Sequence, residues 1–390
     1  MSSRGHFVKA VLLRIHSVVG LALGLVMAVV GLTGATMAFE DKIVAALNAG
    51  LEKVEPREAP ALTPDQLIAR LPSPYNLDKV SGVTMSSDRA AAVHLRFARS
   101  GGGARPSSLY VDPHDGRVLG VPRGEDFFAT VRKLHRWLLL SGDGNGYGRT
   151  ITGTTALCLL AMLITGLVLR WPRRSRSARA WLKPELALRG RGFQRSLHAV
   201  VGTWVLPVYL VFTLTGLWYS FEWYKDGAKW LLARPAATAA PMQKKAPRAA
   251  AAPEAASPGF DRAWATFLHE QGTHYATAQL TLQAGTVVRV RSWSPDASLE
   301  SVRDEFRIDA ASGRLMVSDI YADKTFGERV LAAVLDIHRG SVLGWPGRLA
   351  FMIAAALMPL FVVTGVLLYL SRRRLRRMAE LPQGRLAPGE

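Results

Sequence analysis

The stretch that decides the fold is QRSLHAVVGTWVLPVYLVFTLTGLWYSFE, residues Gln194 to Glu222. A helix needs roughly 20 apolar residues to cross a bilayer, and this stretch is long enough. It nevertheless carries an ionisable side chain, His198, near its basic end. Such a residue is costly to bury in a membrane helix and usually marks a functional site. His198 is therefore the first candidate functional residue.

The same pattern occurs once before in the chain. Nine identical residues recur at a constant offset of 182 positions, namely His16/His198, Val18/Val200, Val19/Val201, Gly20/Gly202, Leu32/Leu214, Thr33/Thr215, Gly34/Gly216, Phe39/Phe221 and Glu40/Glu222. A match of this kind without gaps indicates an internal repeat. We therefore expect two halves, each beginning with a membrane helix that carries a histidine.

Four apolar runs are long enough to be transmembrane helices. They are about Ser17–Phe39, Ile151–Trp171, Ala199–Phe221 and Leu349–Leu370. A cleaved signal peptide is the alternative for the first run. Its length, its internal histidine and its later copy favour a retained helix. The fold class predicted from these runs is an integral membrane α-helical bundle of four helices in two pseudo-symmetric halves.

The net charge of +19 is concentrated beside the apolar runs. The N-terminal segment, residues 170–195 and the tail after Tyr369 contain eighteen basic and three acidic residues, which accounts for +15 of the total. This distribution is the positive-inside signature of a multi-pass membrane protein and excludes a nucleic-acid partner as its cause. It predicts that both termini are cytoplasmic and that the two long loops lie outside.

The two long loops are predicted to be small α+β modules. Alternating apolar residues predict strands at residues 92–96, 108–111, 279–282, 286–293 and 305–308. Two turns lead from these strands into residues 117–121 and 314–317. A turn of the form Asp, three residues, Gly, Arg occurs in both loops, at Asp112–Gly116 and at Asp309–Gly313. The modules are therefore expected to repeat as well.

These features predict the following order along the chain. The first half consists of a tail and first membrane helix (1–40), an external module (41–126), and an outer ligand segment with the second helix (127–172). A basic cytoplasmic loop (173–195) connects it to the second half. The second half consists of a third helix (196–222), a second module (223–335) with an Ala/Pro-rich linker at 232–259, an outer ligand segment with the fourth helix (336–371), and a basic cytoplasmic tail (372–390).

Two further histidines occupy equivalent places in the two halves. His135 and His338 precede the second and fourth membrane helices on the outer side, and each is followed by an arginine, Arg136 and Arg339. If the halves pack about an axis along the membrane normal, His16 faces His198 and His135 faces His338.

Two imidazoles that face each other across a helical bundle suit a haem, whose iron takes one axial nitrogen from each side. Two haem b groups are therefore expected, one near each side of the membrane, with the four histidines as iron ligands. Glycines on the same helix faces leave room for porphyrins, and they are Gly20, Gly34, Gly202 and Gly216. Arg136 and Arg339 are expected to pair with propionates at the outer site.

Other metal chemistry is less well supported by the sequence. The single cysteine, Cys158, excludes an intrachain disulfide and a cysteine cluster, and no CxxCH motif is present for covalent haem. Zinc is the main rival, but each pair offers only two nitrogens. Weak external metal binding at His114, His269 or His274 stays open.

The chain resembles the PepSY-associated transmembrane family. The resemblance rests on HxVVG at the start of the first and third helices, LHRWLL before the second, the Thr-Gly ends of the second and fourth helices before arginine clusters, and the turns DPHDGRVL and DAASGRLM. It covers nearly the whole chain except the Ala/Pro-rich linker.

The resemblance implies a bacterial inner-membrane reductase that is similar to ferric-siderophore reductases of the ferrioxamine type, with periplasmic PepSY-like modules. A ferric siderophore is the expected substrate, and its iron would be released as Fe(II). Because some relatives carry a fused flavin reductase domain and this chain ends soon after Arg377, a separate flavin reductase or quinol is the expected donor, with membrane lipid as the surroundings. A non-enzymatic PepSY module that binds a periplasmic protein or peptide, and a siderophore or haem transporter, are open alternatives.

Overall fold

The structure is a computed structural model, and it describes residues 3–58, 60–73, 75, 79–98, 106–171, 176–233, 259–272, 274–283 and 285–380. It divides into two compact units. The bundle unit comprises Met1–Ala38, Thr130–Asp226 and Ile337–Glu390, and the sheet unit comprises Phe39–Ala129 and Gly227–Asp336. Each unit therefore contains segments from both halves of the chain. Most of the Ala/Pro-rich linker (234–258) lies outside the described residues.

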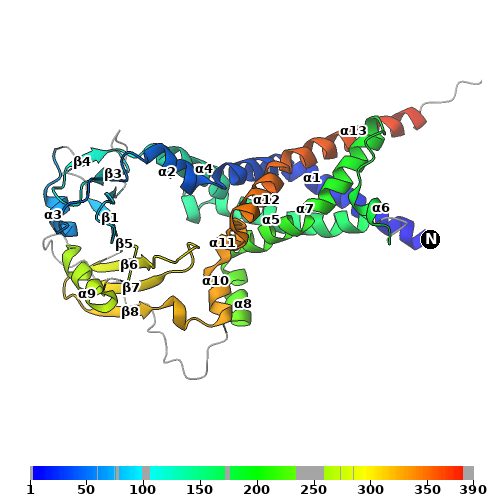
Figure 1. Ribbon diagram of the computed structural model, residues 1–390. Helices are drawn as coiled ribbons and strands as arrows, with labels where there is room; N and C mark the ends of the chain where they lie inside the picture. Colours follow the sequence, from blue (N-terminus) through cyan, green and yellow to red (C-terminus); the bar gives the residue numbers. More distant parts are fainter. Residues whose placement is uncertain are drawn as a thin grey trace, which may run out of the picture. The chain divides into compact units, whose positions relative to one another are not determined.

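The bundle unit contains the four expected membrane-length helices (Figure 1). They are α1 (Ser3–Met37), α5 (Tyr147–Arg170), α7 (Gly190–Ser220) and the pair α12 (Gly344–Ala356) and α13 (Met358–Glu380). α1, α7 and α13 extend into the basic flanks, where Lys and Arg are good helix formers. α5 begins four residues before its apolar run. The predicted basic loop at 173–195 consequently contains the short helix α6 (Ala178–Leu182) and the start of α7.

The fourth span is interrupted at Leu357, which the sequence pattern does not indicate. Pro359 follows two residues later and has no backbone N–H to donate, so a continuous ladder of helical hydrogen bonds is not available there. The Leu357 N–H donates to the carbonyls of Ile353 (3.0 Å) and Ala354 (3.2 Å). Two helices in series result, and together they form one span, Ser341–Met378.

Each histidine-bearing long helix lies between the same two neighbours. α1 packs against α5, α12 and α13, and α7 packs against α5, α12 and α13. Glycines allow two of these close approaches. A Cβ on Gly31 would stand 2.6 Å from Met358 Cβ, and one on Gly153 would stand 2.6 Å from Ser220 Cβ. The buried centre of the bundle includes Met27, Val205, Tyr209, Ala354 and Met358.

The sheet unit is built on one eight-stranded antiparallel sheet with the order β4-β3-β2-β1-β5-β6-β7-β8. Its strands are β1 (Val80–Ser86), β2 (Val93–Phe97), β3 (Ser108–Val111), β4 (Val118–Gly120), β5 (Thr277–Leu282), β6 (Val287–Trp293), β7 (Asp304–Asp309) and β8 (Leu315–Asp319). The five predicted strands are confirmed as β2, β3, β5, β6 and β7. β4 and β8 form in the segments that follow the two predicted turns, and β1 is an addition. The two predicted turns also form alike, since Gly116 and Gly313 have φ of 78° and 74° and donate to Asp112 (3.0 Å) and Asp309 (2.7 Å).

The two α+β modules share this sheet, whereas the sequence suggested two separate modules. β1 of the first module pairs antiparallel with β5 of the second, from Gly82 opposite Thr281 to Ser86 opposite Thr277. Pairing of these two strands satisfies backbone groups that would be unpaired edges in separate modules. Each module thus contributes four strands in chain order on either side of the β1–β5 seam.

Two short helices cover one face of the sheet, α3 (Pro64–Ala69) and α9 (Asp261–Gln271). They cap each other's first turns. Asp65 accepts the backbone N–H groups of Phe260 (2.8 Å) and Asp261 (3.0 Å), while Asp261 accepts the N–H of Asp65 (2.8 Å) and the Thr63 hydroxyl (2.6 Å). Carboxylates at helix N-termini satisfy donors that have no partner within the helix. The exchange therefore ties the two modules together.

The remaining elements connect these parts. They are α2 (Glu40–Asn48), α4 (Glu125–Trp137), α8 (Glu222–Leu232), α10 (Phe326–Ala332), α11 (Val334–His338) and the single 3₁₀ turns η2 (Asp143–Asn145), η3 (Tyr321–Asp323) and η4 (Ser341–Leu343).

Candidate metal centres

The first histidine pair lies between two long helices of the bundle. His16 is on α1 and His198 is on α7, and their ring centres are 6.3 Å apart with an angle of 74° between the ring planes. The structure therefore brings together the two histidines that the repeat relates. We call His16 and His198 the inner pair.

The second pair has the same geometry on different elements. His135 is near the end of α4 and His338 is the last residue of α11, and their ring centres are 6.4 Å apart with an interplanar angle of 72°. We call them the outer pair. A metal–imidazole bond is about 2 Å long, so one ion bound by both rings would hold the ring centres roughly 6 Å apart. Both pairs have this separation.

Every one of the four histidines forms a hydrogen bond with a threonine on a neighbouring helix of its own half. The pairs and their Nδ1–Oγ1 distances are His16–Thr165 (3.0 Å), His198–Thr364 (2.7 Å), His135–Thr33 (3.1 Å) and His338–Thr215 (2.7 Å). α1 thus carries one inner ligand and the threonine of one outer ligand, 17 residues or about 25 Å further along. The equivalent holds for α7.

The threonines fix which nitrogen of each ring carries the proton. Each threonine hydroxyl donates to a carbonyl of its own helix, for example Thr33 to Val29 (2.7 Å) and Thr364 to Leu360 (2.7 Å). A hydroxyl has a single hydrogen, so its oxygen is the acceptor toward the ring and Nδ1 is the donor. Nε2 then has the lone pair and can bind a metal, which is the usual arrangement of a ligating histidine with an oriented second nitrogen.

Each of these threonines is followed by a glycine, and three of the four glycines lie against a histidine ring. A Cβ on Gly34 would stand 3.2 Å from Cε1 of His135, one on Gly166 would stand 3.3 Å from Cε1 of His16, and one on Gly365 would stand 3.9 Å from Cε1 of His198. Gly34 therefore makes room for the ring of an outer histidine. At Gly216 the described residues place no atom within 4 Å of such a Cβ.

The inner pair opens into a cavity of about 1170 Å³. This volume is slightly above the roughly 300–1,000 Å³ of typical small-molecule sites. Gly20 and Gly202 line it, as the sequence predicts for glycines beside a large ligand, and a Cβ on them would stand 3.1 Å from Met162 and 3.6 Å from Phe361. The lining is mostly apolar near the histidines.

The same cavity has a basic rim formed by Arg170, Arg195 and Arg372 among others. Arg372 donates to the Ser17 hydroxyl (3.1 Å), and Arg170 donates to the Ala180 carbonyl. The Nε of Arg170 is buried and has no hydrogen-bond partner among the residues that the structure describes. The site therefore offers cationic donors to an anionic group beside the two imidazoles.

The predicted outer arginines follow their histidines directly. The Arg136 guanidinium lies over the Tyr219 ring at 5.9 Å, and its backbone carbonyl accepts a hydrogen bond from Thr152 (2.9 Å). Arg339 is close enough to His338 to affect its charge. Both arginines are therefore next to the outer pair.

The outer histidines are neutral at physiological pH. Both lie on short helices outside the four membrane-length segments. Burial lowers the pKa of His135 to about 4, with a further contribution from the Arg136 guanidinium. Burial lowers the pKa of His338 to about 3, helped by His135 and Arg339. A neutral imidazole is the form that binds a metal.

A metal held by protein groups alone is not supported. Within the described ranges, no group of three or more His, Cys, Asp or Glu side chains is placed to hold an ion. His114 is buried beside the Arg89 carbonyl (3.3 Å), and His269 is exposed next to Glu270. Each histidine pair thus offers two imidazole nitrogens to any group that binds there.

The threonine partners are the feature that sequence reasoning missed. Thr33 and Thr215 were among the repeated residues, and Thr165 and Thr364 marked the ends of the second and fourth helices. Their hydrogen bonds to the histidines could not be predicted, because each threonine and its histidine lie on different helices.

Comparison with known proteins identifies the family. No curated protein matches the chain. The family model for the PepSY-associated TM region matches residues 13–372, which include both histidine pairs and all four membrane-length helices. The chain therefore belongs to the PepSY-associated transmembrane family.

Proposed function

We propose that this protein is a haem b-containing oxidoreductase of the bacterial inner membrane that reduces ferric siderophores on the periplasmic side and releases iron as Fe(II). The observation that carries the proposal is the presence of two histidine pairs at 6.3 and 6.4 Å, each with Nδ1 held by a threonine. Haem supplies one-electron transfer between Fe(III) and Fe(II) when it is bound at such pairs.

The residues of the inner site fit a haem. His16 and His198 offer one Nε2 from each side, and Gly20 and Gly202 line the cavity without a side chain. Arg170 and Arg372 are suited to hold carboxylates such as propionates, because charge-assisted hydrogen bonds from guanidinium groups are strong. The unpartnered Nε of Arg170 supports this assignment.

At the outer site, His135 and His338 would provide the two axial nitrogens. Arg136 and Arg339 follow them in sequence and are suited to neutralise propionate charge there. The two sites are connected by α1 and α7, each of which holds a ligand of the inner site and orients a ligand of the outer site. The chain thereby fixes the separation between the two sites, about 25 Å along α1.

A pseudo-twofold relation between the halves is part of the proposal. Equivalent residues form equivalent hydrogen bonds in the bundle, and equivalent strands β1 and β5 pair antiparallel at the centre of the sheet. Antiparallel pairing of two equivalent strands is what a twofold axis produces. With the basic flanks inside, both termini and the inner pair are cytoplasmic, and the sheet unit is periplasmic.

The donor and the substrate are separate molecules in this scheme. A flavin reductase or a quinol would deliver electrons near the inner pair. The ferric siderophore is the substrate on the other side, and its reduction weakens binding because Fe(II) is held less well than Fe(III) by hard oxygen ligands. No acid, base or nucleophile of the protein is needed, so the chain's contribution is ligation, spacing and access.

The test uses the full chain in proteoliposomes that contain reduced methyl viologen, so that the natural donor is not needed. A ferric siderophore and an impermeant Fe(II) indicator are added outside. We expect Fe(II) to appear outside with the wild type and with His269→Ala, which changes an exposed histidine. His198→Ala should lose this activity. Equal rates for wild type and His198→Ala would contradict the proposal, and iron found inside the vesicles would indicate a transporter.

A further inference from the structure

The sheet face opposite α3 and α9 carries a concentration of arginines on two neighbouring strands. Arg289 and Arg291 alternate with the buried Val288 and Val290 on β6, so their side chains share the other face. Arg307 on β7 lies on the same face. We call Arg289, Arg291 and Arg307 the arginine face.

Two of these arginines are placed directly opposite each other. Arg289 on β6 is the register partner of Arg307 on β7. Directly opposite side chains of an antiparallel pair have Cβ atoms about 4.5–5.5 Å apart, and like charges in this position are destabilising. The arrangement therefore costs stability unless an anion lies between the two guanidinium groups.

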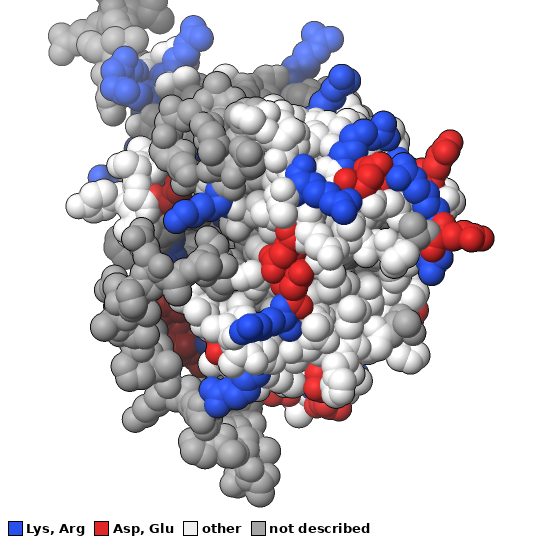
Figure 2. Space-filling model, turned by 90° about the vertical axis from the view of Figure 1, so that its left-hand side faces the viewer, with Lys and Arg blue, Asp and Glu red and all other residues white. Residues whose placement is uncertain are grey.

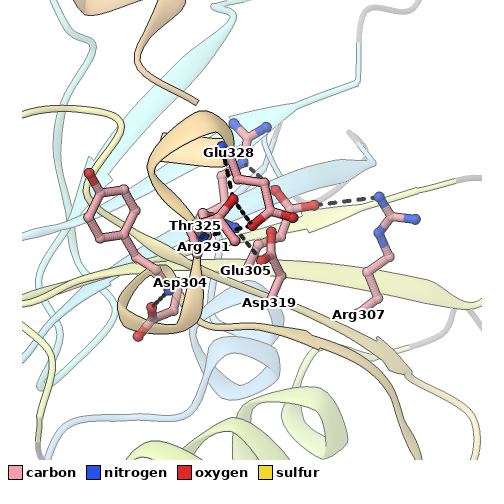
Figure 3. A network of polar contacts seen from close by, with 9 residues as sticks. Arg291, Asp304, Glu305, Arg307, Asp319, Thr325 and Glu328 are labelled. Atoms are coloured by element: carbon pink, nitrogen blue, oxygen red, sulfur yellow. Dashed lines mark hydrogen bonds and ion pairs between the residues drawn. The ribbon is translucent and has the colours of Figure 1, made fainter. Parts of the chain in front are cut away.

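One carboxylate is shared within this group (Figure 3). Glu305 accepts from Nε of Arg291 (3.3 Å) through one oxygen and is 3.6 Å from Nη2 of Arg307 through the other. In the part of the chain that the structure describes, Nε of Arg289 is buried without a hydrogen-bond partner. The three guanidinium groups thus have more donors than Glu305 can use.

One further guanidinium, that of Arg303, lies near Arg289. Partial burial and the neighbouring Arg291 and Arg303 guanidiniums lower the pKa of Arg289, although Glu305 acts in the opposite direction. The Arg303 guanidinium lies over the Trp293 ring at 5.8 Å and donates to the Glu300 carbonyl (2.6 Å). A bound anion would relieve this repulsion, which is the electrostatic signature of an anion site.

The first module lacks this arrangement at the equivalent positions. Ser108 and Tyr110 on β3 occupy the places of Glu305 and Arg307, as judged from the shared Asp-x-x-x-Gly turn. On this part of the sheet, the Glu125 carboxylate is 3.3 Å from Nε2 of His94 and accepts a hydrogen bond from the Ser108 hydroxyl (2.5 Å). On the face that Figure 2 draws, basic and acidic side chains lie close together. Arg96 on β2 lies on the same side of the sheet as the arginine face, but its register partner is Ser108. Among the described strands, two directly opposed arginines therefore occur only in the second module.

We infer that the arginine face binds the carboxylate groups of an anionic ferric chelate, which would make polycarboxylate complexes of iron the preferred substrate class. This inference rests on the proposed function for the identity of the ligand. Guanidinium groups bind carboxylates in a bidentate manner, and two or three of them on adjacent strands can hold a ligand with several carboxylates.

The experiment measures binding of gallium(III) citrate, a redox-inert analogue of ferric citrate, to the full chain in nanodiscs of zwitterionic lipid. At about 0.15 M ionic strength non-specific surface attraction is largely screened. We expect saturable binding to the wild type and about 10- to 100-fold weaker binding to Arg289→Gln/Arg307→Gln. Arg289→Lys/Arg307→Lys keeps the charge without the bidentate geometry, so its affinity for gallium(III) citrate should lie between those of the wild type and the Gln variant.

The control is Arg117→Gln/Arg314→Gln, which removes two exposed arginines that follow the two matched turns. This variant should bind as the wild type does, and thermal unfolding should show that all variants are folded. The inference is wrong if Arg289→Gln/Arg307→Gln binds normally, if metal-free citrate or a neutral ferric trihydroxamate binds as tightly, or if anionic lipid in the nanodisc displaces the chelate.

Binding does not require haem, so the two proposals can fail independently. A chain without haem that binds gallium citrate through Arg289 and Arg307 would refute the proposed function and keep the anion site. A haem-containing chain that reduces neutral ferric chelates but does not bind gallium citrate would support the proposed function and refute the anion site.

Discussion

The two halves of the bundle hold their histidines alike but differ in what lies between them. In the C-terminal half, a continuous series of aromatic rings connects the inner and outer ligands. His198 is 5.4 Å from Phe361, Phe361 is 5.8 Å from Tyr209, Tyr209 is 6.2 Å from Phe212, and Phe212 is 5.4 Å from His338. The equivalent positions in the N-terminal half are Met162, Met27 and Val30.

This difference shows which residues the two histidine sites need and which residues only fill the core between them. The His–Thr hydrogen bonds are present in both halves, whereas the core residues between them have changed from aliphatic and thioether side chains to aromatic ones. Cores accept such exchanges when the total volume is kept, but ligand orientation depends on particular donors and acceptors. The threonines therefore belong to the site, and the aromatic rings belong to the packing of one half.

The largest effect is expected from removing a ligand in either half. His16→Ala and His198→Ala should each lose about one of two haem equivalents, because each inner histidine supplies one of the two axial nitrogens. Haem is counted per chain after purification. If the two variants differ, with only one losing haem, the inner ligands are not an equivalent pair.

Removing a threonine should have a smaller effect that is again equal in both halves. Thr165→Val and Thr364→Val keep the shape of the side chain but leave Nδ1 of His16 or His198 without its acceptor. Loss of such a partner typically lowers metal affinity about 10- to 100-fold. Transfer of haem to an acceptor protein measures this affinity. Thr165→Ser and Thr364→Ser should retain haem as the wild type does; equal losses in the Ser and Val variants would show that the hydroxyl is not the reason.

Asp65 and Asp261 cap each other's helices, so equivalent residues of the two modules can also be compared in the sheet unit. Asp65→Ala removes the cap of α9, and Asp261→Ala removes the cap of α3. Each should destabilise the sheet unit by about 1–2 kcal/mol in chemical denaturation. Because the two carboxylates share one network, the double variant should lose less than the sum. Strict additivity would mean that the two caps act independently.

The smallest effect, on stability, is expected at Tyr209, whose place is taken by Met27 in the N-terminal half. The buried Tyr209 hydroxyl donates to the Ala354 carbonyl (2.8 Å), and Met27 at the equivalent position has no such group. Tyr209→Phe keeps the ring and should lower stability by about 1 kcal/mol, while Met27→Leu should change it less. Thermal unfolding in detergent compares the two. A larger loss for Met27→Leu would reverse our view of which half depends on specific packing.

The sequence was informative wherever the repeat could be read directly. The offset of 182 residues related His16 to His198, and the apolar runs predicted four helices of membrane length. Strands with alternating apolar residues were predicted for the same reason, since burial of one face gives a period of two. These features depend on neighbours within one segment or on exact repetition.

Contacts between segments were not predictable in this way. β1, with the sequence VSGVTMS, has a weak strand pattern and is stabilised by pairing with β2 and β5. The threonine partners of the four histidines depend on which helices are neighbours in the bundle. The contact between Gly34 and His135 is a further example, because the position of Gly34 on α1 does not reveal that His135 lies against it.

The central claim is that each histidine pair binds one haem. The most direct measurement is a haem count on the purified full chain, combined with the dithionite-reduced absorption spectrum and low-temperature electron paramagnetic resonance of the oxidised protein. We predict two non-covalent haem b per chain, both low-spin with two imidazole ligands. A protein with no haem α-band after expression with sufficient haem, or with haem content that is unchanged in His16→Ala and His338→Ala, would contradict the account.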